Sequence, residues 1–166
     1  MMVVLRILAL LLLLALIPFL LWVTFVNLSG REDSRWYGSR PSTLGVRDGK
    51  LSGPKRTPNS VVSEGTEPTN PAYVAPIAFS GDSQAALAKL GSVLQALDRV
   101  TIIKVEDGYL YAEFRSEKMR FIDDFEARVD AAASVIHVRS ASRLGRRDVG
   151  VNRARVEMIR RKFAAS

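Results

Sequence analysis

The pattern of hydrophobic and polar positions begins with an apolar stretch, Ile7–Val26, that contains no charged residue. A helix of these twenty residues spans ~30 Å at ~1.5 Å per residue, which is the hydrocarbon thickness of a bilayer. Arg6 precedes the stretch, and Trp22 and Phe25 near its end suit a membrane interface. We therefore expect a transmembrane anchor over residues 1–28. A cleaved signal peptide is the alternative, although its apolar core is usually shorter.

No period of 2 or 3.6 is sustained over residues 29–80, which hold six of the seven prolines together with many Gly, Ser, Thr and Asn. Such composition is typical of turns and irregular chain. We expect a juxtamembrane linker over residues 29–44 and a Pro-rich irregular part over residues 45–80.

Helical spacing of apolar residues marks both ends of the regular core that we expect over residues 81–164. Ser80 or Ser83 can cap the first helix, and Asn152 the last. The residues with this spacing are Leu87, Leu90, Val93, Leu94 and Leu97 near the start, and Val156, Ile159 and Phe163 near the end.

Four extended segments lie between these helices, over residues 100–105, 109–115, 121–130 and 135–142. Gly108 permits the positive φ of a tight hairpin turn after the first of them. The pattern therefore predicts an α+β fold: an N-terminal transmembrane helix, then a helix, a four-stranded antiparallel meander and a C-terminal helix.

The positive charge is concentrated near the C-terminus. Residues 139–162 carry nine basic side chains against only Asp148 and Glu157, so this segment holds the entire formal charge of +7. The basic residues are Arg139, Arg143, Arg146, Arg147, Arg153, Arg155, Arg160, Arg161 and Lys162.

Three interpretations of this basic segment remain open. It can form a solvated helix face with internal salt bridges, it can be attracted to an anionic membrane surface, or it can form a defined anion site. For the last, backbone N–H groups at the start of the final helix favour negative charge, and guanidinium groups bind carboxylate or phosphate in a fork. The candidate anion-binding residues are Arg139, Arg143, Asn152, Arg153 and Arg155.

Acidic residues oppose this charge in the predicted strand over residues 121–130. Strand alternation puts Asp123 among apolar side chains and Asp124 on the opposite face. A buried carboxylate needs a partner, so we expect Asp123 to pair with an arginine of residues 139–155; a wet edge strand is the alternative. Asp124 and Asp148 are further candidates for structural ion pairs.

No catalytic constellation is evident. Asp123 and Asp124 face opposite ways and cannot form an acid–base dyad, and His137 and Ser140 likewise face apart. With one His and no Cys, no metal site is expected, and no motif implies a cofactor. An enzymatic or small-ligand domain would need a pocket in which Asp123, His137 and Arg139 converge.

Three stretches resemble the domain-of-unknown-function 1499 (DUF1499) family of bacteria and plant plastids: Leu51–Ser63, Phe121–Glu126 and Val138–Arg155. The resemblance implies that residues 45–164 form one domain. Gly53 and Ser60 stand where family members often carry cysteines, which disfavours a redox role.

Members of this family are often membrane-attached or exported. With the anchor that the apolar stretch predicts, we expect a single-pass protein of the bacterial inner membrane. The resemblance favours a domain in the periplasm, the cytoplasmic orientation being the alternative. We expect a membrane-anchored, non-catalytic module whose partner besides the bilayer is anionic, a lipid headgroup or a protein, bound through Arg139–Arg155. A nucleic-acid partner is not expected.

Overall fold

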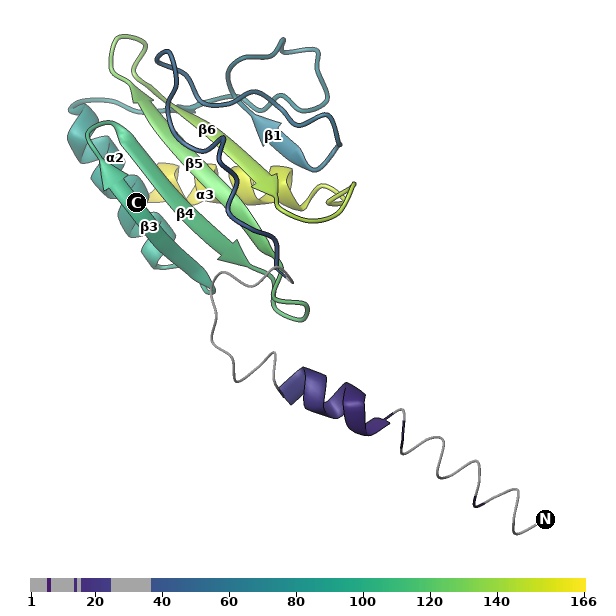
Figure 1. Ribbon diagram of the computed structural model, residues 1–166. Coiled ribbons are helices and arrows are strands. Elements are labelled where there is room, and N and C mark those ends of the chain that lie inside the picture. Colours follow the sequence, from purple (N-terminus) through teal and green to yellow (C-terminus); the bar gives the residue numbers. More distant parts are fainter. Residues whose placement is uncertain (1–5, 7–13, 15, 25–36) are drawn as a thin grey trace. The chain divides into compact units, whose positions relative to one another are not determined.

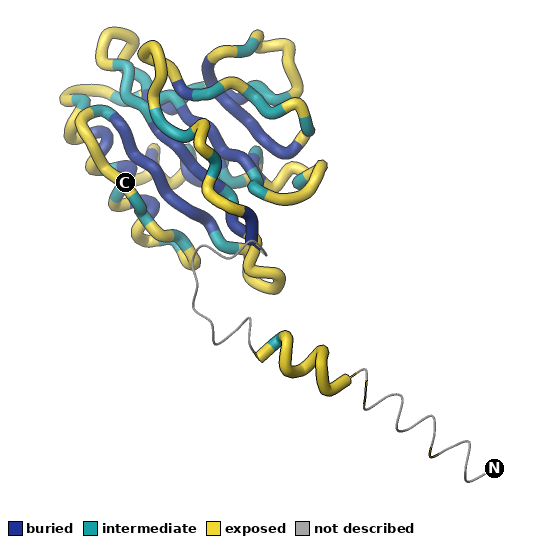
Figure 2. The backbone as a smooth tube through the Cα atoms, in the orientation of Figure 1, coloured by how far each residue is buried: buried dark blue, intermediate teal, exposed yellow. Residues whose placement is uncertain are grey.

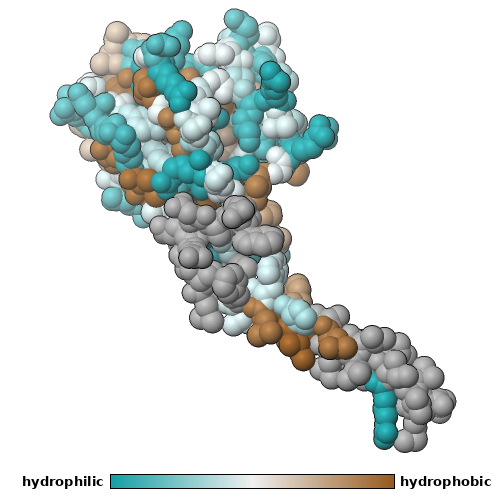
Figure 3. All heavy atoms as spheres, viewed as in Figure 1, coloured by the Kyte–Doolittle hydropathy of each residue, from teal (hydrophilic) through white to brown (hydrophobic). Residues whose placement is uncertain are grey.

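The computed structural model describes residues 6, 14, 16–24 and 37–166 of the chain, which divides into two compact units, Met1–Ser34 and Arg35–Ser166. In the first unit, residues 16–24 are helical. Their large apolar side chains are exposed and form the hydrophobic area of that unit in Figure 3. The second unit is an α+β domain.

Within the described residues, no helix combines the length and the apolarity that a membrane crossing requires. The expected transmembrane helix, and the single-pass inner-membrane location that depended on it, are therefore wrong. A span needs ~20 predominantly apolar residues in one helix. Positions 7–13, 15, 25 and 26 of the expected span lie outside the described residues.

The domain contains an antiparallel sheet of six strands in the order β1-β6-β5-β4-β3, with β2 also pairing with β6 (Figure 1). The elements are β1 (Ser60–Val62), β2 (Ile77–Ala78), α2 (Ser83–Gln95), β3 (Val100–Glu106), β4 (Tyr109–Arg115), β5 (Ile122–Asp130), β6 (Val135–Ser142) and α3 (Val151–Ala165). The expected meander of four strands therefore gains β1 and β2. Both lie in the Pro-rich part expected to be irregular, and both are too short to show a period of their own.

One face of the sheet packs against α2 and α3 (Figure 1). The core between them is built from Leu90 and Leu94 of α2, Ile159 of α3, and Phe125 of β5, all essentially inaccessible to solvent. The ring of Phe125 lies edge-on to that of Phe114, with centroids 5.9 Å apart. The apolar face of each helix and the apolar face of the sheet thus pack together in one layer.

Neither helix begins as expected. The cap of α2 is Asp82, whose Oδ2 accepts a hydrogen bond from the Ala85 amide at 2.7 Å, and neither predicted serine caps it. At α3, Gly150 has a φ of 84° and precedes the helix. The Asp148 carboxylate there accepts from the Asn152 amide at 2.9 Å. Asn152 itself lies buried in the first turn and is not the cap.

The other face of the sheet is crossed by residues 37–53, which we call the strap (dark blue in Figure 1; Figure 2 shows the buried strands beneath it). Leu51 of the strap packs against Tyr109 and Tyr111 of β4 in a small second cluster. Part of the expected linker over residues 29–44 therefore belongs to the domain.

Candidate functional site

Beneath the strap, strand alternation lines up charged and tyrosine side chains on one surface, which we call the charged face. In the sheet register, Glu126 lies opposite Tyr111 on one side and Arg139 on the other. Four carboxylates there face four guanidinium groups. The members are Glu64, Glu113, Asp124 and Glu126, with Arg40, Arg128, Arg139 and Arg143, and the side chains of Tyr109, Tyr111 and His137.

Arg143 joins one end of the charged face to the strap. Its side chain is 1% exposed, and its Nη2 lies 2.8 Å from Asp124 Oδ1 and also contacts Glu113 Oε1. Its Nη1 donates to the carbonyl oxygen of Gly38 at 3.2 Å. Burial lowers the pKa of Arg143, but the bonds to Asp124 and Glu113 outweigh burial and raise it, so the guanidinium stays charged. Arg40 of the strap adds a 2.7 Å ion pair to Glu113.

Glu126 holds the middle of the strap. Its carboxylate is fully buried, and Oε2 lies 3.0 Å from Nη1 of Arg139. Oε1 accepts hydrogen bonds from the Tyr109 hydroxyl at 2.9 Å and from the Gly45 amide at 2.7 Å. Every donor around this carboxylate is therefore internal to the domain, and one of them belongs to the strap.

Glu64 holds the far end of the strap, where its Oε1 accepts from the Leu51 amide at 2.9 Å and its Oε2 pairs with Arg128 at 2.9 Å. Nearby, Ser63 Oγ lies 3.2 Å from His137 Nδ1. The same oxygen accepts from the Val138 amide at 2.8 Å. His137 thus has a serine neighbour, but this serine is Ser63, directly after β1, and not Ser140. The contact lies inside the domain.

The carboxylates of the charged face should make the fold less stable at acid pH. Burial raises the pKa of Glu64, but hydrogen bonds from Arg128 and the Leu51 amide outweigh it and leave the pKa below its usual range. Burial acts the same way on the pKa of Glu113, where bonds from Arg40 and Tyr111 lead the opposing effects and lower it. Such groups stabilise the fold fully above ~4.3, the ordinary glutamate pKa, and lose this contribution as pH falls through the lower folded values.

We expect the melting temperature to fall between about pH 6 and about pH 3, as these carboxylates take up protons. Glu64→Gln should melt lower at the upper pH and fall less over the range. Glu106→Gln, which removes an exposed carboxylate paired with Lys104, is the control and should keep the wild-type profile. A Glu64→Gln profile parallel to the wild type in thermal unfolding would contradict this assignment.

The opposite face of the sheet carries a separate polar group at the start of α3. Asp123, which alternation puts among apolar side chains, lies 2.6 Å from Arg155 Nη2. The Arg155 guanidinium also lies 4.6 Å from the ring centre of Phe114. Asn152 Oδ1 accepts from Ser140 Oγ at 2.6 Å. These contacts fix the first turns of α3 against β5 and β6.

The predicted site residues are thus divided between the two faces. Asp123 lies on the helix side and His137 and Arg139 on the strap side, so the pocket in which all three converge is not formed. Arg139 and Arg143 pair with buried carboxylates, and Asn152 is itself buried. Arg153 differs, because it lines a cavity.

This cavity, which we call the α3 cavity, has a volume of 360 Å³. Two Arg153 hydrogen bonds, to the carbonyl oxygens of Pro71 (2.6 Å) and Tyr73 (2.7 Å), hold its guanidinium at the wall. The lining residues are Pro54, Lys55, Arg56, Thr57, Pro58, Ser60, Val61, Asn70, Pro71, Ala72, Asp148, Gly150 and Arg153.

Lys55 and Arg56 were not among the residues expected to bind an anion. Lys55 Nζ donates to the carbonyl oxygen of Ser142 at 2.8 Å. Burial lowers the pKa of Lys55, and the charge of Arg139 acts in the same direction. Both residues lie in the Pro-rich stretch without periodicity, and the only signal there is the family-like segment Leu51–Ser63. Among the described residues, no three His, Cys, Asp or Glu side chains are grouped to hold a metal ion.

The cavity joins two of the three stretches that resemble a known family. Leu51–Ser63 supplies the loop with Lys55 and Arg56, and Val138–Arg155 supplies Asp148 and Arg153. A family model described as "Protein of unknown function (DUF1499)" matches residues 50–163. The chain belongs to the DUF1499 family. Among curated proteins, none matches the chain.

The DUF1499 match begins within the strap, so residues 37–49 lie outside the matched range. The family-like loop before β1 is closed by a hydrogen bond from the Lys55 amide to Ser60 Oγ at 2.8 Å. Ser60 therefore holds the loop of the α3 cavity through its hydroxyl group. The chain contains no cysteine.

Proposed function

We propose that this DUF1499 protein is a non-catalytic module that binds a small phosphate- or carboxylate-bearing ligand in the α3 cavity. The observation that carries the proposal is the lining: Lys55, Arg56 and Arg153 meet around one cavity, and the only acidic residue among the lining residues is Asp148. The cavity volume of 360 Å³ lies at the lower end of the range for small-molecule sites, which is about 300–1,000 Å³.

The carboxylate of Asp148 already accepts hydrogen bonds from the backbone at the start of α3. Burial raises its pKa, but the amides of Asn152 and Gly150 outweigh burial and lower it, so the carboxylate is ionised and held at the helix start. The helix dipole favours this negative charge, and the basic lining is left in excess. Arg153 is fixed by two carbonyl oxygens before any ligand arrives, which lowers the entropic cost of binding.

Binding without chemistry is favoured by the partners of the other ionisable groups. His137 and Ser63 contact each other inside the domain. Asp123 and Asp124 lie on opposite faces, each in an ion pair with an arginine. The basic residues of the cavity supply charge and hydrogen bonds, which suit the recognition of phosphate or carboxylate groups.

Arg56→Gln and Arg153→Gln are each expected to weaken the binding of inorganic phosphate by about ten- to a hundredfold, because a hydrogen bond to a charged group contributes about 1.5–3 kcal/mol. Isothermal titration calorimetry at constant ionic strength measures this. Arg161→Gln is the matched control, since Arg161 is an exposed residue of the last turns of α3 outside the cavity.

An equal loss of phosphate affinity in all three variants would show that only the net charge of the protein matters, and it would overturn the proposal. Unchanged phosphate affinity in Arg56→Gln and Arg153→Gln would do the same. Melting temperatures of the three variants, measured in parallel, separate loss of binding from loss of folding.

A further inference from the structure

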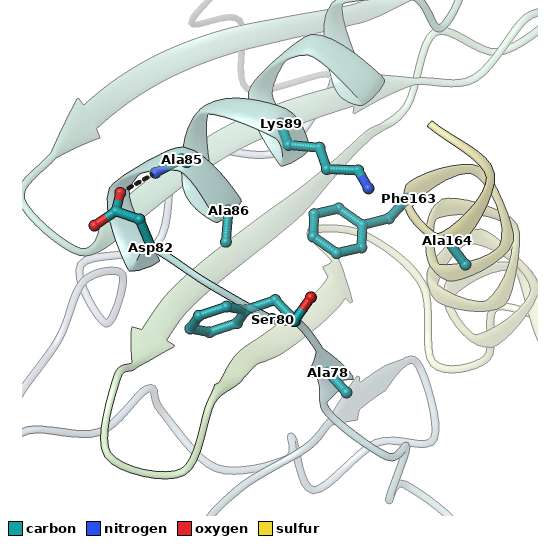
Figure 4. A pocket seen from close by; sticks show the side chains of 9 residues that line it. Ala78, Ser80, Asp82, Ala85, Ala86, Lys89, Phe163 and Ala164 are labelled. Carbon is teal, nitrogen blue, oxygen red and sulfur yellow. Dashed lines mark hydrogen bonds between the residues drawn. The ribbon is translucent and has the colours of Figure 1, made fainter.

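A second cavity, with a volume of 340 Å³, lies between the start of α2 and the end of α3 (Figure 4). None of its lining residues lines the α3 cavity. Its wall is mostly alanine and phenylalanine: Ala78, Phe79, Ala85, Ala86, Phe163 and Ala164. The remaining lining residues are Ser80, Asp82 and Lys89.

Lys89 brings the positive charge of this cavity. Its Nζ lies 4.7 Å from the ring centre of Phe163, and Figure 4 shows the ammonium from α2 beside the ring from α3. A cation over an aromatic face is held in place without an anion. In the described part of the chain, no carboxylate forms an ion pair with Lys89. The Asp82 carboxylate at the opposite rim caps α2 through Oδ2.

We infer that this cavity binds a small amphipathic acid: one carboxylate on a short alkyl chain or an aromatic ring. The carboxylate pairs with Lys89, which gains a counter-ion that it lacks among the described residues. The apolar part displaces water from Phe79, Phe163 and the alanine methyl groups, whose burial is favourable by ~25 cal/mol per Å². The site thus combines an apolar wall with the Lys89 charge at one rim and the Asp82 carboxylate, which caps α2, at the other; a mostly apolar lining with few polar groups is the usual composition of small-molecule pockets.

Octanoate and 1-octanol, which share the same tail length, separate the two contributions. In calorimetric titration below the micellar range of octanoate, Lys89→Gln is expected to weaken octanoate binding about tenfold, the effect of a lost charge-assisted contact, and to leave 1-octanol binding unchanged. Equal octanoate binding by wild type and Lys89→Gln would overturn the inference, as would an equal loss for both ligands.

A filled cavity gives a second, independent test. Ala85→Leu places a larger side chain in the wall at an exposed helical position, where leucine is well tolerated. It is expected to weaken both ligands. Ala88→Leu is the control, because Ala88 is an exposed residue of the same helix outside the cavity. Unchanged binding in Ala85→Leu, or equal loss in Ala88→Leu, would contradict the site. Phosphate binding in the α3 cavity is expected to be unchanged in Lys89→Gln, so a phosphate titration of this variant distinguishes the two sites.

Discussion

Replacing Arg143 with methionine is expected to lower the free energy of unfolding by about 3–5 kcal/mol, the range for breaking a buried ion pair. The side chain is 1% exposed and contacts Asp124 and Glu113. Without it, these two carboxylates lie close to each other with one cation, Arg40, at the edge. Their mutual repulsion and the loss of the bond to the Gly38 carbonyl oxygen add to the cost. Urea unfolding followed by circular dichroism measures the change.

The matched control for this experiment is Arg161→Met, which makes the same replacement at an exposed position of α3. It is expected to change stability by no more than about 0.5 kcal/mol. A loss below about 1 kcal/mol in Arg143→Met would show that the charged face is hydrated or rearranges easily, and the buried ion pairs would then have no role in stability.

Glu126→Gln should be nearly as destabilising as Arg143→Met, because it leaves Arg139 buried without its counter-charge. The expected loss is about 3–5 kcal/mol. Glutamine keeps the size of the side chain and can still accept one hydrogen bond from the Gly45 amide, so the effect isolates charge from packing. Urea unfolding gives the global loss, and hydrogen exchange of the Gly45 amide reports the strap separately.

Glu157→Gln provides the comparison on the surface, since Glu157 pairs with Arg160 while 41% exposed. Exposed pairs contribute about 0–1 kcal/mol. If the two glutamine variants lost equal stability, the Arg139–Glu126 pair would be no stronger than a solvated one. If Gly45 exchange stayed unchanged in Glu126→Gln, the carboxylate would not hold the strap.

The helices and strands of the C-terminal half of the domain can be predicted from the local pattern of hydrophobic and polar residues. Alternation and turn residues predict β4 and β6 with their observed bounds, and helical spacing predicts the buried face of α2, including Leu90 and Leu94. Alternation also separates Asp123 from Asp124, and the two side chains do lie on opposite faces. These features depend on the period of one element, which the sequence contains.

The strap, β1 and β2 depend instead on pairing between distant parts of the chain. β1 and β2 form because they pair with the edge of β6. The residues of such a short strand do not themselves indicate which distant strand it will pair with. A polar strand face also has the same period whether water or a strap covers it. For this reason the basic segment was open to interpretation as an anion site, although Arg139 and Arg143 are internal.

The α3 cavity was only partly predictable. Arg153 belonged to the expected anion-binding residues because its guanidinium lies near the start of the final helix, where backbone N–H groups favour negative charge. Lys55 and Arg56 reach the same cavity through the fold of a proline-rich loop, and their contribution required the structure. The membrane anchor was the opposite case: hydropathy alone predicted it, and no helix of the described residues has the required length and apolarity.

The strap also determines how the domain would respond to mechanical tension. A pull applied through the chain before Tyr37 is transmitted first to Gly38 and Arg40, whose contacts with Arg143 and Glu113 tie the strap to the sheet. None of these strap contacts involves α2 or α3, so a pull at this end of the domain acts first on the charged face and not on the apolar layer of the opposite face. The strap would therefore be the first part of the domain to detach under force, ahead of the helices and the sheet strands that pack against them.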